Sequence, residues 1–255
     1  MVSLDQRTDK LEFVEEVRKM NILCVGDSLT YGNVGYSYLP FLNKSFKTIN
    51  KGLNGDTLYG LTNRLEKILI NDKSNYDLMI LGIGINDILL PYLKRIDLYW
   101  KLQMSIRCKL KRCMDHDSIF LICFDNLMKM IHSKGKKAIV FGLPYINLTD
   151  FPNNISTKRN QEMKFVCEKY GFDFIDIYRL QEENLPTEKK IYSWKWSFLV
   201  RVLDAATMTL FPKSKDRFAS NRELVQTVDG VHFSSITAKL LAKEIESKVV
   251  VETLT

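Results

Sequence analysis

The sequence lacks any run of about 18 consecutive apolar residues, the length that a membrane-spanning helix requires. Its first 20 residues contain acidic side chains and no apolar core like that of a secretory signal. It also lacks internal repeats and low-complexity linkers, and 45% hydrophobic with 26% charged residues is an ordinary globular composition. We therefore expect a cytoplasmic protein in which residues 1–255 form one domain, with an N-terminal extension over 1–19.

Cysteine and histidine are also scarce, with five and three residues. The cysteine count is odd, no Cys-x-x-Cys pair occurs, and nothing indicates export, so we expect reduced thiols rather than disulfides. Cys108 and Cys113 have no histidine nearby at the spacing of zinc ligands. The sequence therefore predicts no metal site.

The net charge of +7 is concentrated in two segments. Residues 94–113 hold seven Lys and Arg against one Asp, residues 187–226 hold eight against four acidic residues, and the remainder is about −3. All three tryptophans, Trp100, Trp194 and Trp196, lie in these segments. An isoelectric point near 9.0 raises nucleic-acid binding as an alternative. No Arg-rich recognition helix or known nucleic-acid motif accompanies the charge, so we expect no nucleic-acid partner.

Short apolar runs alternate with helix-length segments, which is typical of βαβ units and a parallel sheet. We predict a three-layer α/β/α sandwich with a flavodoxin-like, doubly wound sheet of about five strands. The predicted strands are Asn21–Val25, Phe46–Lys51, Leu78–Gly82, Lys137–Gly142 and Phe172–Ile177. The predicted helices are Thr57–Ile70, Ser118–Ser133, Ser156–Tyr170, Ser235–Val249 and one around Lys10–Lys19. In such folds ligands bind beyond the carboxyl ends of the strands.

Three polar motifs follow the first three predicted strands. In Gly26-Asp27-Ser28-Leu29-Thr30, a serine on a strand-to-helix turn can combine an exposed hydroxyl with a free N–H, or merely belong to a helix cap. In the next motif, Gly55 precedes a helix that Asp56 or Thr57 could cap, so it is either an anion-binding glycine or a plain turn glycine. Asn86, in the third, could donate to an oxyanion or form an Asx-turn.

A fourth motif, Asp229-Gly230-Val231-His232, lies near the C-terminus. An aspartate three residues before a histidine can accept a hydrogen bond from Nδ1–H and leave Nε2 free as a general base. His116 and His132 have no acidic residue at the equivalent position. His232 is therefore the candidate base.

Together and in this order, the four blocks resemble those of the SGNH hydrolases, the GDSL family of esterases and lipases. The blocks are Gly26-Asp27-Ser28-Leu29, Asn54-Gly55-Asp56-Thr57, Gly84-Ile85-Asn86-Asp87 and Asp229-Gly230-Val231-His232. The resemblance implies a Ser28 nucleophile, a His232 base and an orienting Asp229. It further implies an oxyanion hole of the Ser28 and Gly55 N–H groups and the Asn86 amide, with Gly52 a weaker choice than Gly55. It implies acyl transfer from small ester substrates through an acyl-serine, without metal or cofactor.

The chain departs from short members of that family in two insertions, 94–113 and 187–226, which we expect near the active site. Three interpretations of residues 195–211 stay open: a helix packed on the body, a lid that binds an acyl chain, and a helix that transiently contacts an anionic membrane surface. Trp100, Trp194 and Trp196 are candidate substrate contacts. An esterase of lipase or acylhydrolase type is the function that we expect.

Two alternatives remain open on the same scaffold. A carbohydrate O-deacetylase would use the same triad, with a tryptophan stacked on the sugar. A non-catalytic ligand-binding protein would use the scaffold without the chemistry, although every expected catalytic residue is present.

Overall fold

The structure is a computed structural model, and it describes residues 20–71, 76–114, 116–187 and 190–254. The N-terminal helix predicted around Lys10–Lys19 lies outside the described residues. The strands are β1 (Asn21–Gly26), β2 (Lys47–Gly52), β3 (Leu78–Gly82), β4 (Ala138–Phe141) and β5 (Asp173–Ile175). All their pairings are parallel, in the order β2-β1-β3-β4-β5. The predicted doubly wound sheet is therefore confirmed, each strand within about two residues of its predicted bounds.

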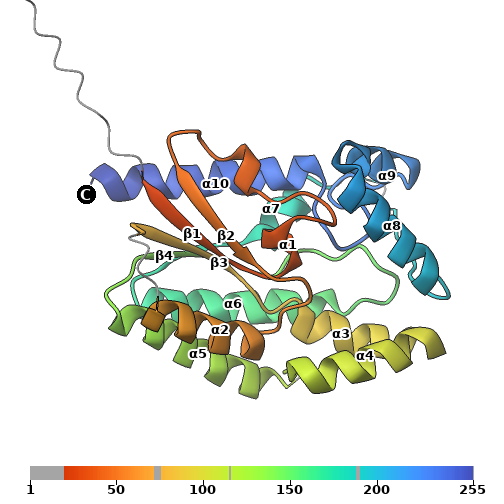
Figure 1. The fold of residues 1–255 in the computed structure, drawn as a ribbon, viewed down its shortest axis with the longest axis horizontal. Helices are drawn as coiled ribbons and strands as arrows, with labels where there is room; N and C mark the ends of the chain where they lie inside the picture. The colour runs from red at the N-terminus through yellow and green to blue at the C-terminus, as the bar shows by residue number, and fades with distance from the viewer. Residues whose placement is uncertain (1–19, 72–75, 115, 188–189, 255) are drawn as a thin grey trace, which may run out of the picture.

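Helices cover both faces of this sheet (Figure 1). The α-helices are α1 (Ser28–Tyr31), α2 (Leu58–Asn71), α3 (Asn86–Ile96), α4 (Leu98–Lys111), α5 (Asp117–Ser133), α6 (Asn153–Lys169), α7 (Ile177–Glu183), α8 (Phe198–Leu210), α9 (Lys215–Asn221) and α10 (Ser235–Leu254). Two 3₁₀ helices, η1 (Leu39–Phe41) and η2 (Pro212–Ser214), complete the regular elements of the described chain. Helices α2, α5 and α6 lie on one face and α10 on the other. None of the described helices is long and apolar enough to cross a membrane.

The inner strands β1, β3 and β4 are the most apolar because helices cover both faces of the sheet. Every residue of β3 is buried, as is every residue of β1 after Asn21. The edge strand β2 reads Lys-Thr-Ile-Asn-Lys-Gly and has no buried residue. Burial thus explains why β1 and β3 are unbroken apolar runs, whereas β2 shows mixed polarity.

Both sequence segments rich in basic residues form helices at one end of the molecule. Residues 94–113 contain the end of α3 and all of α4, and residues 187–226 contain α8, η2 and α9. Figure 1 shows α4 and α8 together beyond the carboxyl ends of the strands, where the four polar motifs also lead.

Candidate active site

The register of the sheet brings the first three motifs to one edge. Gly26, the last residue of β1, is paired with Gly52 of β2 on one side and with Gly82 of β3 on the other. Because the three strands end at the same level, the turns that follow them lie side by side. Ser28, Gly55 and Asn86 consequently line one cavity.

Ser28 is the first residue of the short helix α1. The Asp27 carboxylate caps this helix by accepting a hydrogen bond of 2.9 Å from the Leu29 N–H. The Ser28 N–H has no acceptor among the residues that the structure describes. A free N–H beside a hydroxyl, at a helix start that favours negative charge, is suited to an oxyanion.

Gly55 lies in the turn between β2 and α2 with a φ of +65°, a conformation that favours glycine. Its N–H also lacks an acceptor in the described part of the chain. A methyl group placed on Gly55 would lie 3.7 Å from Nη1 of Arg107. The guanidinium of α4 therefore stands over the second candidate oxyanion donor.

Asn86, at the start of α3, is buried beside these two groups. Its Nδ2 donates to the Asp56 carbonyl at 2.9 Å and to Oδ2 of Asp27 at 3.4 Å. The first bond orients the amide, whereas the second is long and weak, so its hydrogen is the one available to an oxyanion. Burial raises the pKa of Asp27 to about 7, against the opposing effect of the Leu29 N–H.

Asp87, the neighbour of Asn86, supports the framework around the site. Its two carboxylate oxygens accept from the N–H groups of Leu58 and Met114, each at 2.8 Å. Burial raises its pKa to about 7. Asp87, rather than Asp56, thus satisfies the first N–H of α2, and Asp56 instead pairs with Arg64 at 2.9 Å.

The fourth motif folds into a tight turn in which Asp229 holds His232. Asp229 Oδ2 lies 2.8 Å from His232 Nδ1, and Oδ1 accepts from the N–H groups of Val231 and His232 at 3.0 and 2.8 Å. Asp229 is fully buried, and His232 lines the same cavity as Ser28. With Nδ1 bound to the carboxylate, Nε2 is left for proton transfer.

A third group contacts Asp229. Arg201 of α8 donates through Nη2 to Oδ2 of Asp229 and through Nη1 to Asp204 at 2.7 Å. Arg222 donates to the same oxygen of Asp204. Burial alone would raise the pKa of Asp229, but His232 and the Arg201 guanidinium together hold it well below its usual range. Asp229 is therefore ionised in the folded protein near neutral pH.

The cavity has a volume of about 270 Å³ and a mostly apolar inner wall. That wall comes from α3, α4, α8 and the segment before α8: Leu89, Leu90, Leu93, Trp100, Met104, Trp194, Phe198, Val202 and Ala205. Polar side chains also line the cavity: Asn33, Asn54, Gln103, Arg107 and Arg201. The cavity can accept an apolar group beside a polar centre.

The three tryptophans differ in their positions. Trp100 and Trp194 line the cavity and stack on one another, with ring centroids 5.2 Å apart. Trp194 also donates through Nε1 to the Asp229 carbonyl at 2.7 Å, and Arg201 covers its ring at 4.9 Å. Trp196, expected at the substrate, does not line the cavity and is 65% exposed. The backbone N–H of Trp196 donates to the Asp97 carboxylate at 2.7 Å. This bond fixes the backbone in a position that leaves the indole turned outward.

The sequence motifs did not identify two residues of the site, Arg201 and Arg107. The sequence does contain an indication of Arg201, because Arg201 and Asp204 are the only charged residues of α8 and their spacing of three places them on one helical face. Nothing in the sequence distinguishes Arg107 from the other basic residues of α4.

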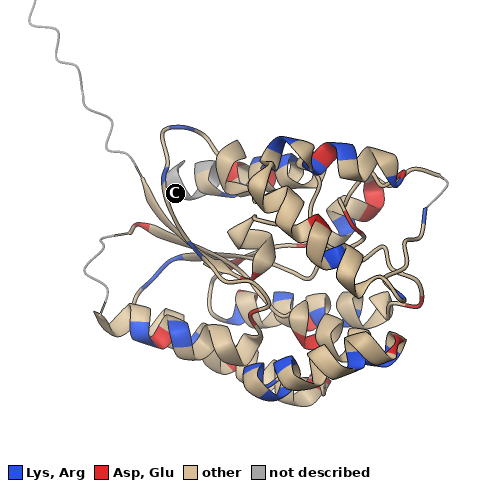
Figure 2. Ribbon diagram, turned by 45° about the vertical axis from the view of Figure 1, so that its right-hand side comes forward, with Lys and Arg blue, Asp and Glu red and all other residues tan. Residues whose placement is uncertain are grey.

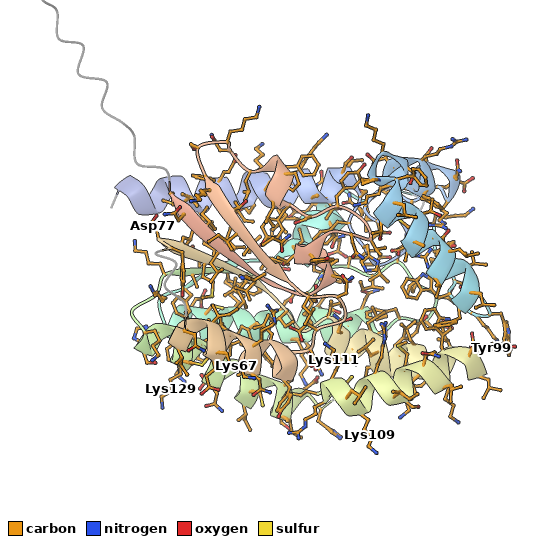
Figure 3. The ribbon with its side chains drawn as sticks, in the orientation of Figure 1. Lys67, Asp77, Tyr99, Lys109, Lys111 and Lys129 are labelled. Carbon is orange, nitrogen blue, oxygen red and sulfur yellow. The ribbon has the colours of Figure 1, made fainter. Side chains whose placement is uncertain are left out.

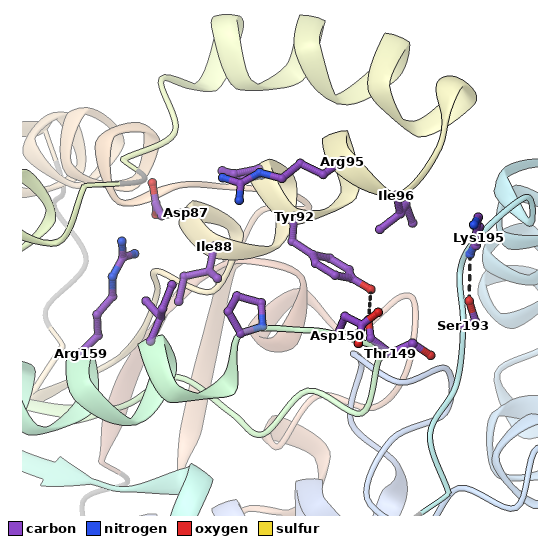
Figure 4. A pocket seen from close by; sticks show the side chains of 13 residues that line it. Asp87, Ile88, Tyr92, Arg95, Ile96, Thr149, Asp150, Arg159, Ser193 and Lys195 are labelled. Carbon is purple, nitrogen blue, oxygen red and sulfur yellow. Dashed lines mark hydrogen bonds between the residues drawn. The ribbon is translucent and has the colours of Figure 1, made fainter.

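A larger cavity of about 460 Å³ lies beside the site, between α3 and the start of α6 (Figure 4). Figure 4 shows Tyr92 donating to the Thr149 carbonyl at its wall, with Arg95 and Lys195 nearby. Ser28, Asp229 and His232 are not among the residues that line this cavity. It is therefore separate from the candidate catalytic groups.

Residues 24–195 match the model of the GDSL-like lipase/acylhydrolase family. This stretch contains the first three motifs and ends before α8. None of the curated proteins compared with the chain matches it.

Several solved structures share the fold at low sequence identity. A catalytic mutant of an acetylxylan esterase from Geobacillus stearothermophilus has a TM-score of 0.58 and 17% identity, covering 89% of this chain and 92% of that one. A member of the lipolytic G-D-S-L family from Veillonella parvula has a TM-score of 0.56 and 15% identity, over 89% and 97% of the chains. An α/β hydrolase from the metagenome of Lake Arreo has the same score and identity, over 89% and 94%.

Proposed function

Because the chain belongs to the GDSL-like lipase/acylhydrolase family, whose members are generally ester hydrolases, we propose that it is a serine esterase with Ser28, His232 and Asp229 as its triad. One observation carries the proposal: Ser28, His232 and Gly55 line a single cavity, and the N–H groups of Ser28 and Gly55 have no acceptor among the described residues. In the Geobacillus enzyme, catalytic mutants are described at a serine, an aspartate and a histidine. That aspartate and histidine are three positions apart, as Asp229 and His232 are in this chain.

In the first step, Ser28 Oγ forms a bond to the ester carbonyl carbon while its proton passes to His232 Nε2. Asp229 stabilises the resulting imidazolium through Nδ1. The negative charge on the former carbonyl oxygen is held by the Ser28 and Gly55 N–H groups and the Asn86 amide. The bond to the alcohol oxygen then breaks, and the alcohol leaves with the proton of His232.

In the second step, water takes the place of the alcohol. The oxygen of a water molecule attacks the acyl-serine while His232 accepts a proton from that water. The proton then passes to Ser28 Oγ as the carboxylic acid leaves. The apolar wall of the cavity favours an aliphatic acyl group, and the Arg107 guanidinium favours an anionic group on the substrate.

Labelling with a fluorophosphonate tests the nucleophile, and esters of increasing acyl length test the substrate. Wild type should be labelled, whereas Ser28→Ala and His232→Ala should not, and the exposed-site control Ser220→Ala should be labelled normally. An unlabelled wild type would favour the ligand-binding alternative.

Carbohydrate O-deacetylation is the second candidate, favoured by the fold shared with acetylxylan esterases. The contacts of Trp100 and Trp194 weigh against it, because one face of each ring is covered by the other and Arg201 also covers Trp194. Faster acetate release from acetylated xylan than from any aliphatic ester would reverse this preference.

A further inference from the structure

Helix α8 buries its charged residues and exposes apolar ones, which is the reverse of an ordinary surface helix. Its only charged residues, Arg201 and Asp204, are 5% and 7% exposed and are paired with one another. The apolar residues that are at least half exposed are Leu199, Val200, Val202, Leu203 and Leu210. A helix at a protein–water boundary normally presents its polar face outward. The outer face of α8 is therefore built for apolar surroundings.

Helix α4 carries a similar exposed apolar stripe. The stripe follows helical spacing and consists of Tyr99, Leu102, Ile106 and Leu110, each more than half exposed. Leu102 and Ile106 directly precede Gln103 and Arg107, which line the catalytic cavity. The stripe thus borders the cavity on the α4 side.

The apolar surfaces of α4 and α8 meet around the cavity. Val202 of α8 is half exposed and also lines the cavity wall. Just before the first residue of α8, Trp196 packs edge-on against Tyr99 of α4, with ring centroids 6.2 Å apart. Figure 1 shows the two helices at the same end of the molecule. Exposed apolar side chains on both sides of one cavity mark a site of contact with another molecule or a membrane.

Basic side chains occur on α4 and on both sides of α8 in the sequence. Helix α4 has four Lys and Arg and no acidic residue, and Lys195 and Lys213 come before and after α8 in the sequence. Figure 2 shows the Lys and Arg positions of the ribbon in blue and the Asp and Glu positions in red. Lys109 extends outward from α4 (Figure 3). Lys101, Lys109, Lys195 and Lys213 make no ion pair with any described residue. The carboxylate of Asp97 is occupied by the N–H groups of Trp100 and Trp196.

We propose that α4 and α8 form a docking surface for an anionic lipid bilayer. Exposed leucines, with lysines on the same elements that make no ion pair with a described residue, are complementary to acyl chains below a layer of negative headgroups. Docking would place the mouth of the catalytic cavity against the lipid, where acyl esters concentrate. The docking does not depend on the esterase proposal, whereas the delivery of acyl esters rests on it.

Co-flotation with vesicles tests the docking without reference to activity. Full-length Ser28→Ala protein is mixed with vesicles of phosphatidylcholine alone or of equal parts phosphatidylcholine and phosphatidylglycerol. We expect binding to the anionic vesicles and a decrease of binding with added salt. In this background, Leu199→Asp with Leu203→Asp should weaken partitioning at least about tenfold. Lys101→Glu with Lys109→Glu should also weaken it, by about tenfold or more.

Matched controls change the same residue types elsewhere. Ile122→Asp with Phe165→Asp alters exposed apolar residues of α5 and α6, and Lys129→Glu alters a lysine remote from α8 (Figure 3). Both controls should bind as the parent does. The same substitutions made with Ser28 intact should leave cleavage of a soluble short-chain ester unchanged, which reports folding.

Three results would overturn the docking proposal. The first is a parent protein that does not float with anionic vesicles. The second is binding that the α8 and α4 substitutions leave unchanged. The third is a dimer in sedimentation that Leu199→Asp with Leu203→Asp dissociates, without vesicle binding, since a second copy would then cover the surface. Loss of ester cleavage with intact flotation would contradict the esterase proposal alone.

Discussion

Arg201 and His232 contact the same oxygen, Oδ2, of Asp229. The carboxylate that orients the candidate base therefore also anchors α8, a helix from outside the stretch matched by the family model. The surface that we propose for lipid docking and the candidate triad are thus joined by one buried ion pair. Movement of α8 away from the body would require breaking it.

Replacement of Arg201 by Met should impair both stability and catalysis. Removing one partner of a buried ion pair leaves an uncompensated charge, at a cost of about 3–5 kcal/mol. Loss of Arg201 should also lower kcat on a soluble ester, because Oδ2 of Asp229 then loses one of the two contacts that hold it beside His232. Arg201→Lys should restore part of both effects in urea unfolding and steady-state kinetics. An unchanged kcat would show that Arg201 has a purely structural role, and the exposed Arg179→Met serves as control.

Replacement of Asn86 by Ala should lower kcat with little change in KM. Loss of one oxyanion donor typically raises the barrier by about 2.7–4 kcal/mol, or 10²–10³ in rate. Steady-state kinetics on a soluble ester measure the effect, and urea unfolding accounts for the lost bond to the Asp56 carbonyl. Asn33→Ala, on the same cavity but with its amide directed to Thr209 Oγ1 at 3.5 Å, should change kcat less than tenfold. Equal effects of the two substitutions would exclude Asn86 from the oxyanion hole.

Replacement of Ala205 by Phe should shift the acyl-length preference toward short chains. Ala205 lines the cavity from α8, so a larger side chain would fill the space proposed for the acyl group. KM for a long-chain ester should rise by about tenfold or more, the equivalent of burying two methylene groups, with little change for an acetate ester. The adjacent, exposed Ala206→Phe should leave both unchanged. A uniform loss on all esters would mean that the acyl chain binds elsewhere.

Asp27 should make the protein less stable as the pH rises from about 4 to about 7. Its pKa is about 7 in the folded protein, because of burial, and about 3.9 when unfolded. Between these values the folded state retains a proton that the unfolded state releases, so the free energy of unfolding falls with pH. The slope from one such group reaches about 1.4 kcal/mol per pH unit.

Asp27→Asn should remove this contribution while keeping an oxygen that caps α1. Urea unfolding at pH 5, 6 and 7 measures the difference in slope between the variant and wild type. Glu66→Gln, at an exposed position of α2, should retain the wild-type slope. A variant slope equal to that of wild type would show that Asp27 is ionised throughout this range.

Local patterns sufficed to predict the sheet and the motifs at its edge. Unbroken apolar runs marked β1 and β3 because both of their faces are buried, and the polar turns after the strands located Ser28, Gly55 and Asn86. Parallel strands place their carboxyl ends at one edge, so chain order alone predicted that these residues would meet. His232 could be paired with Asp229 because the two are only three residues apart.

Contacts between distant segments could not be predicted in this way. Arg201 meets Asp229 across 28 positions, and nothing in a linear pattern specifies which carboxylate a helical arginine reaches. Trp196 resembles its neighbour Trp194 in sequence, yet one indole is turned outward and the other is buried over the site.

The sequence by itself determined the strand order along the chain, the four motifs and the concentration of positive charge in two segments. Only the tertiary structure decided which way α8 faces. An amphipathic pattern specifies two faces of a helix but not which of them is buried, and here the Arg201–Asp229 and Arg201–Asp204 contacts draw the polar face inward. The leucines of α8 are consequently left on the outside, around the mouth of the candidate active site.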